Sequence, residues 1–498
     1  MGKETVLLTG ASGSMGFEAF QLLWEKRDRY DLVLLLRPLA KNKRQFSKYE
    51  KEAGIRTFKG AGTARGNGLK VVWGDVQSRE DVNEACRGID ICLHPMALIS
   101  PAADRDPEMA RKVNHLGTKS IVEAIETQDP DHIRMVCIGS VAEYGDRLPD
   151  VHVARTGDPI IPSVYDHYAL SKISGELAVM QSRIRHRVSL RQTFIMIPGL
   201  FGLMDPIMFH QPVNSFMENI TARDSGRLLV SCLDIPPDSD FWGGYYNISG
   251  GPACRTTFLE FLDRIYGMLG MEYRKVMERN WFALKNFHMV YFEDSGVLNR
   301  YLHHWDGGQT QEDYYREVWR KLPGSLKLTA WLCKHVPPFR RVVQKITFGQ
   351  LKKLARQPEG TLHWLEKGET GKIEAFFGSR EAQQSIGGWD DPMPSLDHNQ
   401  AHRRLDHGFD ESKPVLDISD LQKAAHFRGG ALAAETWSGE MHEKIQWKCS
   451  RGHDFEMTPH AVLKGGHWCH ACISEPWNYK ELAQTNPFAA QVLTNQLV

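Results

Sequence analysis

A glycine-rich turn near the N-terminus constrains the fold of this chain more than any other feature. Thr5–Thr9 is a short apolar run that predicts a buried strand, and Phe17–Arg27 has the spacing of a helix. Between them, Gly10, Gly13 and Gly16 follow a GxxGxxG spacing. Glycines let the backbone approach a pyrophosphate closely, and the start of the next helix offers free N–H groups. The order strand, glycine turn, helix therefore predicts a dinucleotide-binding site.

The segments that follow continue the alternation of strands and helices. Four more apolar runs predict strands at residues 32–36, 69–73, 90–97 and 135–139, and Asn114–Thr127 has a helical pattern. Strands that alternate with helices form parallel sheets. We therefore expect an α/β fold built on a Rossmann-type, doubly wound parallel sheet, with a small substrate-binding lobe after it.

The residue that ends the second predicted strand is Arg37. An acidic residue at this place binds the ribose 2′-hydroxyl of NAD, whereas an arginine suits the 2′-phosphate of NADP. Lys41, Lys43 and Arg44 add positive charge in a polar insertion over residues 38–68. The pattern therefore favours NADP. NAD remains an alternative, with Arg37 as a solvated residue at the strand end.

A tyrosine and a lysine four residues apart, Tyr168 and Lys172, fall on one face of a predicted helix. A nearby ammonium lowers the pKa of a phenol and makes it a usable acid or base. The same pair also occurs by chance on helix surfaces. Ser140 stands at the carboxyl end of the predicted strand 135–139, where ligands bind in open α/β sheets.

Several motifs occur one after another along residues 1–320. They are Thr9-Gly10-x-x-Gly13-x-x-Gly16, Gly74-Asp75-Val76, Val113-Asn114-x-x-Gly117-Thr118, Ser140 followed by Tyr144-Gly145, Tyr168-x-x-x-Lys172, Leu190-Arg191, Pro198-Gly199 and Tyr246-Asn247-Ile248. Together they resemble the extended branch of the short-chain dehydrogenase/reductase family, which holds NAD-dependent epimerases and dehydratases and many carbonyl reductases.

The resemblance implies a role for particular residues of this chain. Tyr168 would be the acid/base, Lys172 would tune it and bind the nicotinamide ribose, Ser140 would hold the reacting oxygen, and Asn114 would support a proton relay. Asp75 would meet the adenine amino group. The residues implied in cofactor binding are Gly10, Ser12, Gly13, Ser14, Met15, Gly16, Arg37, Asp75, Val76, Met96, Ala97, Tyr168, Lys172 and Pro198.

Two departures from the family pattern limit what can be carried over. His94-Pro95-Met96-Ala97 stands where the family often has His-x-Ala-Ala, so the cofactor contact there is altered. Dehydratases of the family carry an Asp-Glu pair directly after the serine or threonine, but here Val141-Ala142 follow Ser140 and Glu143 comes one position later. Sugar dehydration is therefore disfavoured.

Composition narrows the class of protein. The 498 residues carry 61 Lys+Arg and 61 Asp+Glu, so no overall charge favours nucleic acid or an anionic membrane. Most of the nine cysteines are scattered through apolar surroundings and do not form a disulfide framework, which predicts a cytoplasmic location. We expect neither a secretory signal nor a transmembrane helix.

Two segments after the predicted sheet carry less specific patterns. The substrate lobe, about residues 199–322, is rich in Phe and Met, which suits a hydrophobic or aromatic substrate but equally a core.

Residues 323–416 form a basic helical arm followed by an irregular linker. From Arg320 to Arg356 there are ten Lys/Arg and no Asp/Glu. We expect this arm to pack on the domain or a second subunit; peripheral membrane contact is the weaker alternative.

A separate cysteine cluster follows at residues 417–475. Trp447-Lys-Cys449-Ser-Arg-Gly-His453 and Trp468-Cys469-His-Ala-Cys472 supply three thiolates and one imidazole. That ligand set predicts a closed, structural zinc site. The segment resembles treble-clef zinc-ribbon modules, and residues 476–498 would form a C-terminal tail. Acidic residues are interspersed with its basic ones, so it gives no strong nucleic-acid signal.

These observations predict an NADPH-dependent carbonyl reductase or alcohol dehydrogenase that acts on a small-molecule substrate through Ser140, Tyr168 and Lys172. A nucleotide-sugar epimerase is the first alternative, since it uses the same residues. A nucleotide-sensing or nucleic-acid-binding regulator is the second. We also expect a homo-oligomer.

Overall fold

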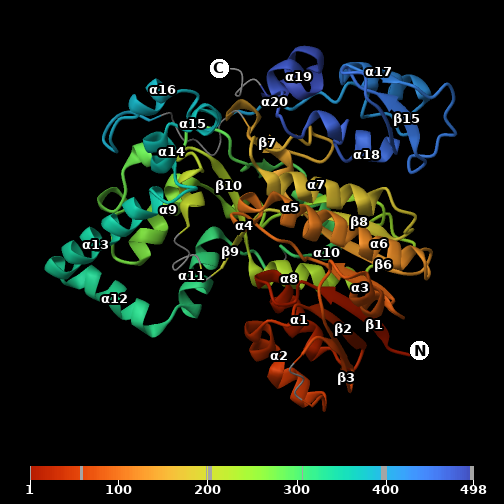
Figure 1. Ribbon diagram of the computed structural model, residues 1–498, viewed down its shortest axis with the longest axis horizontal. Coiled ribbons are helices and arrows are strands. Elements are labelled where there is room, and N and C mark those ends of the chain that lie inside the picture. The colour runs from red at the N-terminus through yellow and green to blue at the C-terminus, as the bar shows by residue number, and fades with distance from the viewer. Residues whose placement is uncertain are drawn as a thin grey trace.

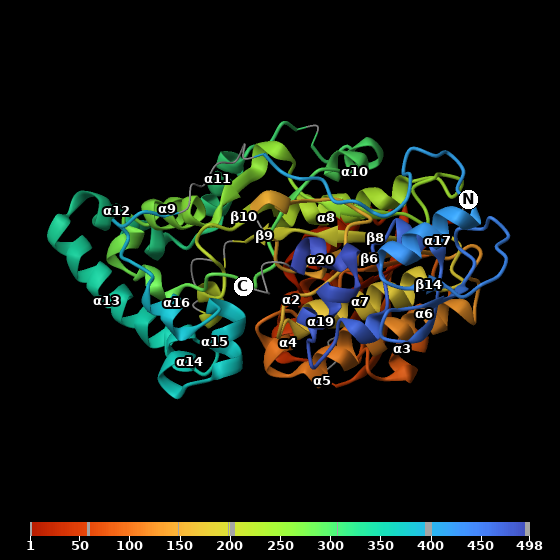
Figure 2. The same ribbon diagram turned by 90° about the horizontal axis from the view of Figure 1, so that it is seen from above.

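The protein is described by a computed structural model that covers residues 2–56, 60–147, 149–197, 199, 205–305, 307–393 and 401–493. A central sheet with helices on both faces forms one end of the molecule, and a helical arm projects from the other end (Figures 1 and 2). Within the described residues, no helix is both long and apolar enough to cross a membrane.

The central sheet has eight strands in the order β11-β8-β6-β5-β1-β2-β4-β3. All neighbours are parallel except the β3–β4 pair, which is antiparallel at one edge. The predicted parallel sheet is therefore confirmed. The strands are β1 (Glu4–Thr9), β2 (Tyr30–Leu36), β3 (Gly62–Gly66), β4 (Leu69–Trp73), β5 (Ile91–His94), β6 (Arg134–Ser140), β8 (Arg187–Gln192) and β11 (Tyr245–Ile248).

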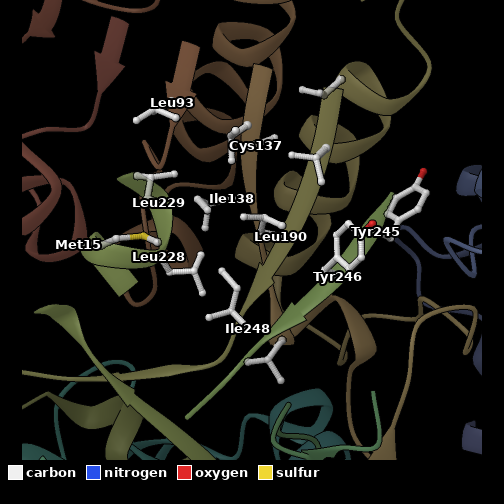
Figure 3. Close-up of a cluster of buried hydrophobic side chains, with 14 of the residues drawn as sticks. Met15, Leu93, Cys137, Ile138, Leu190, Leu228, Leu229, Tyr245, Tyr246 and Ile248 are labelled. Atoms are coloured by element: carbon white, nitrogen blue, oxygen red, sulfur yellow. The ribbon is translucent and has the colours of Figure 1, made fainter. Parts of the chain in front are cut away.

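Helices cover both faces of this sheet because its strands are apolar on both sides. One face carries α3 (Arg79–Cys86), α6 (Thr118–Glu126) and α7 (His167–Met180), and the other carries α1 (Ser14–Glu25) and α8 (Ala222–Ser231). Figure 3 shows the core between the sheet and the second layer, where Met15 of α1 lies beside Leu228 and Leu229 of α8.

Three local features differ from the expected pattern. The polar insertion contains a helix and a strand that the sequence pattern did not predict, α2 (Ala40–Glu52) and the edge strand β3. The predicted helix over Asn114–Thr127 begins as a π-helix, Arg111–Gly117, before α6. The segment Val188–Met196 has the pattern of one long strand, but it is interrupted at Thr193, so β9 (Phe194–Met196) pairs with β10 in a second sheet.

The lobe is built around this second sheet, in the order β12-β10-β9. Phe209, Phe216, Met217 and Phe241 of the lobe are buried in the core. These four residues therefore belong to the core, which was one of the two interpretations of the Phe- and Met-rich lobe. Phe201 and Met204 lie outside the described residues. The lobe's main elements are β10 (Phe216–Thr221), β12 (Arg255–Thr257), α9 (Phe258–Met268), β13 (Tyr291–Phe292), α10 (Ser295–Leu302) and α11 (Gln311–Lys321).

Short segments connect these elements. They are α4 (Ala102–Arg105), α5 (Pro107–Ala110), the two-residue strand β7 (Val153–Ala154), and 3-10 turns at Val141–Tyr144, Pro149–Val151, Pro206–Phe209, Cys232–Asp234, Pro252–Cys254, Tyr273–Lys275 and Arg279–Trp281.

The arm is more regular than its sequence predicts. The basic segment forms a hairpin of α12 (Gly324–His335) and α13 (Pro337–Ala355). The expected irregular linker contains α14 (Thr361–Lys367), α15 (Thr370–Phe377) and α16 (Arg380–Gln384), which enclose a small core of their own. The hairpin packs on the lobe through Phe348, whose ring lies 5.2 Å from that of Trp281, and it exposes Leu328 and Trp331. Membrane contact through this hairpin stays a prediction.

The C-terminal segment forms a compact module beside α7 (Figure 1). Its antiparallel sheet has the order β14-β15-β16. The elements are α17 (Ile418–Phe427), β14 (Ala431–Leu432), β15 (Ile445–Lys448), β16 (Asp454–Met457), α18 (Pro459–Leu463), a 3-10 turn at His470–Cys472, α19 (Tyr479–Thr485) and α20 (Pro487–Leu493).

Candidate functional site

The glycine turn joins β1 to α1 at the point where the strand order of the sheet reverses. Gly10 has a positive φ of 62°, and a Cβ there would lie 2.8 Å from the Met96 Cα. A Cβ on Gly16 would lie 2.3 Å from the Gly10 carbonyl oxygen. Both positions therefore require glycine, because α1 and the loop after β5 approach the turn closely.

The start of α1 is suited to an anionic group. Gly13 caps the helix without a side-chain hydrogen bond, and the first turn holds no acidic residue. Ser12 is half-buried, while Gly13 and Ser14 are exposed. The Gly13 N–H donates to the Gly10 carbonyl at 2.9 Å, so the N–H groups that follow it in the first turn of α1 are the ones that can hold a pyrophosphate. Met15 is buried in the core, so only its backbone is available to a ligand.

Of the residues expected at the adenosine end of the cofactor site, some are exposed and others already contact other parts of the chain. Arg37 is exposed directly after β2, as the NADP prediction requires. Lys43, in contrast, lies over the Trp73 ring at 4.0 Å and donates to the Gly60 carbonyl at 2.8 Å. Asp75 is half-buried, and its carboxylate accepts the Gln77 N–H at 3.0 Å.

The other residues predicted to contact the cofactor differ in how deeply they are buried. Val76 is buried, and its methyl groups occupy the space where a Cβ on Gly117 would lie. Met96 and Ala97 are half-buried in the loop after β5. Pro198 lies outside the described residues, so its predicted contact stays untested.

The catalytic residues predicted from sequence meet at the carboxyl end of β6. Asp166 caps α7 by accepting the Ala169 N–H at 2.8 Å, and this helix carries Tyr168 and Lys172. Ser140 is the last residue of β6, and its side chain lies close enough to the Tyr168 phenol to lower the pKa of that phenol. The structure therefore brings serine and phenol together.

The electrostatic environment of Tyr168 differs from the expectation. Burial raises the pKa of Tyr168 above its ordinary value; the Ser140 side chain opposes this shift, and nearby carboxylates add to it. The Lys172 ammonium, which was expected to tune the phenol, donates to the Ile138 carbonyl at 2.6 Å. The phenol is therefore neutral at physiological pH, which suits a proton donor.

Asn114 lies in the π-helix and clamps two segments together. Its side-chain oxygen accepts the Leu98 N–H at 2.7 Å, and its amide donates to the Leu98 carbonyl and the Ser171 hydroxyl, both at 2.9 Å. These bonds fix the loop after β5 against α7. A role in proton relay stays a prediction.

A buried histidine lies beside the site, in the segment where the sequence departs from the family pattern. His94 lies between the hydroxyls of Thr9, at 2.8 Å, and Thr118, at 2.9 Å. Burial, with a smaller contribution from Lys172, lowers the pKa of His94 to about 3. His94 is therefore neutral in the folded protein at any moderate pH.

We expect His94 to make the protein sensitive to acid. In the unfolded chain this imidazole takes up a proton near the ordinary histidine pKa of 6.5, whereas in the folded chain it does not until about pH 3. The stability that neutral His94 provides is therefore complete above pH 6.5 and is lost as the pH falls toward 3, at about 1.4 kcal/mol per pH unit. The free energy of urea unfolding of a His94→Gln variant should depend less on pH over this interval. His132→Gln, at an exposed site, is the control, and an unchanged slope in His94→Gln would contradict the assignment.

Sequence reasoning did not assign a role to a buried charge cluster beneath Ser140. Glu143 accepts the Ser140 N–H at 2.8 Å, and Arg191 lies 3.3 Å from the other Glu143 oxygen. Arg191 also donates to Glu176 of α7 at 2.7 Å. The motifs containing Glu143 and Arg191 were visible in the sequence, but nothing in it indicated that the two side chains meet.

The predicted metal ligands also come together. The Sγ atoms of Cys449, Cys469 and Cys472 each lie 3.5 Å from the His453 Nδ1 atom, and the Cys449 and Cys472 sulfurs are 3.6 Å apart. All four ligand atoms lie within 4.8 Å of one another. Ligands around a tetrahedral zinc ion would be separated by about 3.6–3.8 Å. The donor set and its spacing therefore fit a metal ion.

Part of the chain is similar to known proteins. Residues 41–214 match the 3-beta hydroxysteroid dehydrogenase/isomerase family. Human sterol-4-alpha-carboxylate 3-dehydrogenase, decarboxylating, is 27% identical over 133 residues, which cover 27% of this chain and 34% of that protein. The Bos taurus protein of the same name is 26% identical over 133 residues, 27% of this chain and 36% of that protein. The chain thus spans about a third of the length of these curated relatives.

Solved structures with the same general architecture include enzymes that act on nucleotide sugars. A dTDP-glucose 4,6-dehydratase from Bacillus anthracis, in complex with NAD, is 15% identical with a TM-score of 0.47, covering 64% of this chain and all of that one (100%). A UDP-glucuronic acid 4-epimerase from Bacillus cereus, in complex with NAD, is 17% identical with a TM-score of 0.43, covering 63% and 99%. From its ordered motifs, the chain is similar to the extended short-chain dehydrogenase/reductase superfamily, and its residues 41–214 match the 3-beta hydroxysteroid dehydrogenase/isomerase family.

Proposed function

We propose that this protein is an NADPH-dependent oxidoreductase that interconverts a carbonyl and an alcohol on a hydrophobic substrate. The observation that carries the proposal is the position of the Tyr168 phenol beside the Ser140 side chain at the carboxyl end of β6. A neutral phenol beside a serine hydroxyl can protonate a carbonyl oxygen as the carbonyl carbon is reduced.

The residues of this chain would divide the work as follows. Ser140 would orient the substrate oxygen, and Tyr168 would donate its phenolic proton to that oxygen. Lys172 would hold the nicotinamide ribose, and the Gly10–Gly16 turn would bind the pyrophosphate. Bound NADPH would supply the hydride.

The substrate class follows from the family rather than from a cavity. The matched family and the curated relatives are described by steroid and sterol substrates. A fused-ring alcohol or ketone is therefore the first substrate to test. The proposal extends to the metal: zinc, held by Cys449, His453, Cys469 and Cys472, would have a structural role, because the four ligands leave no open position.

The proposal is tested by net turnover of added cofactor. Purified protein should consume NADPH when supplied with a steroid 3-ketone and should produce it from the corresponding alcohol. Simple aliphatic and aromatic ketones serve as comparison substrates. Protein that retains a tightly bound nucleotide and shows no net oxidation or reduction would support an epimerase instead.

Cofactor preference should depend on Arg37. Replacing it with aspartate removes the partner of the 2′-phosphate and adds a repelling charge. A charge-assisted hydrogen bond contributes about 1.5–3 kcal/mol. We therefore expect the Kd for NADPH to rise roughly 10- to 100-fold, while that for NADH rises little. Titration of the cofactor by fluorescence measures both. Arg56→Asp, an exposed change in the same insertion, is the control, and equal losses for the two cofactors would exclude the role.

A further inference from the structure

The C-terminal module is packed directly on the helix that carries Tyr168 and Lys172. Ser174 of α7 is 3.0 Å from the His470 Nε2 atom, and the Gln181 amide donates to the Thr458 hydroxyl at 2.9 Å. His470 lies between the metal ligands Cys469 and Cys472 in sequence. Hydrogen bonds thus fix the metal-ligand segment to the outer face of α7.

His467 of the module extends into the interior of the catalytic domain. The Nε2 atom of His467 lies 2.7 Å from the Glu176 carboxylate of α7, and both side chains are at most 2% exposed. The adjacent Gly465 carbonyl accepts a hydrogen bond from Arg191 at 2.7 Å. The module therefore supplies two polar partners to the interior of the catalytic domain.

These contacts continue without a break to the catalytic serine. The Glu176 carboxylate is hydrogen-bonded to His467 and Arg191, and Arg191 forms an ion pair with Glu143. Glu143 in turn accepts the Ser140 N–H at 2.8 Å. A Cβ on Gly139 would lie 3.0 Å from side-chain atoms of all three charged residues. The backbone that presents Ser140 therefore rests on this cluster.

The buried ionisable side chains of the cluster each need a hydrogen-bond or ion-pair partner. Two buried acidic side chains, Glu143 and Glu176, share one guanidinium, Arg191; burial and the neighbouring Glu176 charge raise the pKa of Glu143 to about 8. A buried charge that loses a partner is costly, so neighbouring groups rearrange to replace it. Arg191 already donates to both Glu176 oxygens, and His467 is the second partner of Glu176 Oε1. Without His467, Glu176 and Arg191 would shift together to satisfy that oxygen, away from Glu143 and the Ser140 turn.

We propose that His467 is a positioning residue for the catalytic site: its hydrogen bond to Glu176 holds Arg191 and Glu143 in place and thereby fixes Ser140 beside Tyr168. The inference deepens the proposed function, because it assumes that Ser140 acts in catalysis. The metal ligand Cys469, two residues further along the chain, fixes the backbone that carries His467.

The test compares His467→Ala with two related variants. His467→Ala should lower kcat about 10- to 100-fold with little change in the Kd for NADPH, since small displacements of catalytic groups have effects of this size. His467→Gln can still donate to Glu176 and should recover much of the loss. Glu176→Gln breaks the same contact from α7, away from the module, and should lower kcat with the metal content unchanged.

A second readout does not depend on substrate or activity. Hydrogen–deuterium exchange of residues 138–147 should speed up in His467→Ala and Glu176→Gln. His442→Ala is the control, because His442 contacts the same domain through Arg187 at 3.4 Å but does not touch the charge cluster. The control should leave both exchange and kcat unchanged.

Three outcomes would overturn the inference. They are unchanged exchange of residues 138–147 in His467→Ala, no recovery in His467→Gln, or equal effects in His442→Ala. If instead exchange responds as expected but Tyr168 proves dispensable for turnover, the proposed function fails and the positioning of the Ser140 turn stands.

Discussion

Replacing Tyr168 with phenylalanine should lower kcat by about 10²–10⁴-fold, the usual contribution of a positioned general acid. The variant removes only the hydroxyl that lies beside Ser140. The ring remains, so the Kd for cofactor should change little. Steady-state rates of NADPH consumption, together with a cofactor titration, separate the two effects.

Tyr165 provides a matched control for this variant. It lies three positions before Tyr168 and is also half-buried, but the Lys372 ammonium lies over its ring at 4.4 Å, away from Ser140. Tyr165→Phe should retain full activity. A Tyr168→Phe protein as active as wild type would remove the basis for the oxidoreductase assignment.

Loss of the metal should unfold the C-terminal module. Purified protein should contain about one zinc ion per chain, and the Cys469→Ser, Cys472→Ser double variant should contain none. Structural zinc sites bind with about 10–16 kcal/mol of apparent free energy, much of which is folding free energy in small domains. We therefore expect rapid proteolysis within residues 417–493 in the double variant.

The control for this experiment is Cys333→Ser, a change at a buried cysteine of α12 remote from the cluster. It should retain the metal and resist protease as wild type does. A double variant that loses metal but keeps a protease-resistant module would show that the ion is dispensable for folding.

The sequence predicted the parts of the fold that depend on local patterns. Apolar runs such as Leu32–Leu36 lie within β2, because a strand buried on both faces needs continuous apolar residues. The glycine turn was predictable because few residues other than glycine tolerate the backbone of Gly10. Helices α14–α16 were missed, because their short length gives only weak periodicity, and packing around Trp364 stabilises them instead.

The candidate site was predictable only in part for a related reason. The motifs identified Ser140, Tyr168 and Lys172, and the cysteine spacing identified the metal ligands. Long-range contacts are not encoded in spacing, so the partner of Lys172, the Ile138 carbonyl, could not be anticipated. The raised pKa of Tyr168 also depends on burial by residues distant in sequence.

The contact between His467 and Glu176 has a consequence for how the protein is made in the cell. The two residues are separated by 291 positions. At a synthesis rate of about 5–20 residues per second, Glu176 leaves the ribosome roughly 15–60 seconds before its partner. During that interval the nascent domain holds an incompletely paired acidic group in its interior. Completion of the N-terminal domain therefore waits for the later segment, so newly made chains should depend on chaperones and on zinc supply for longer than a free-standing domain would.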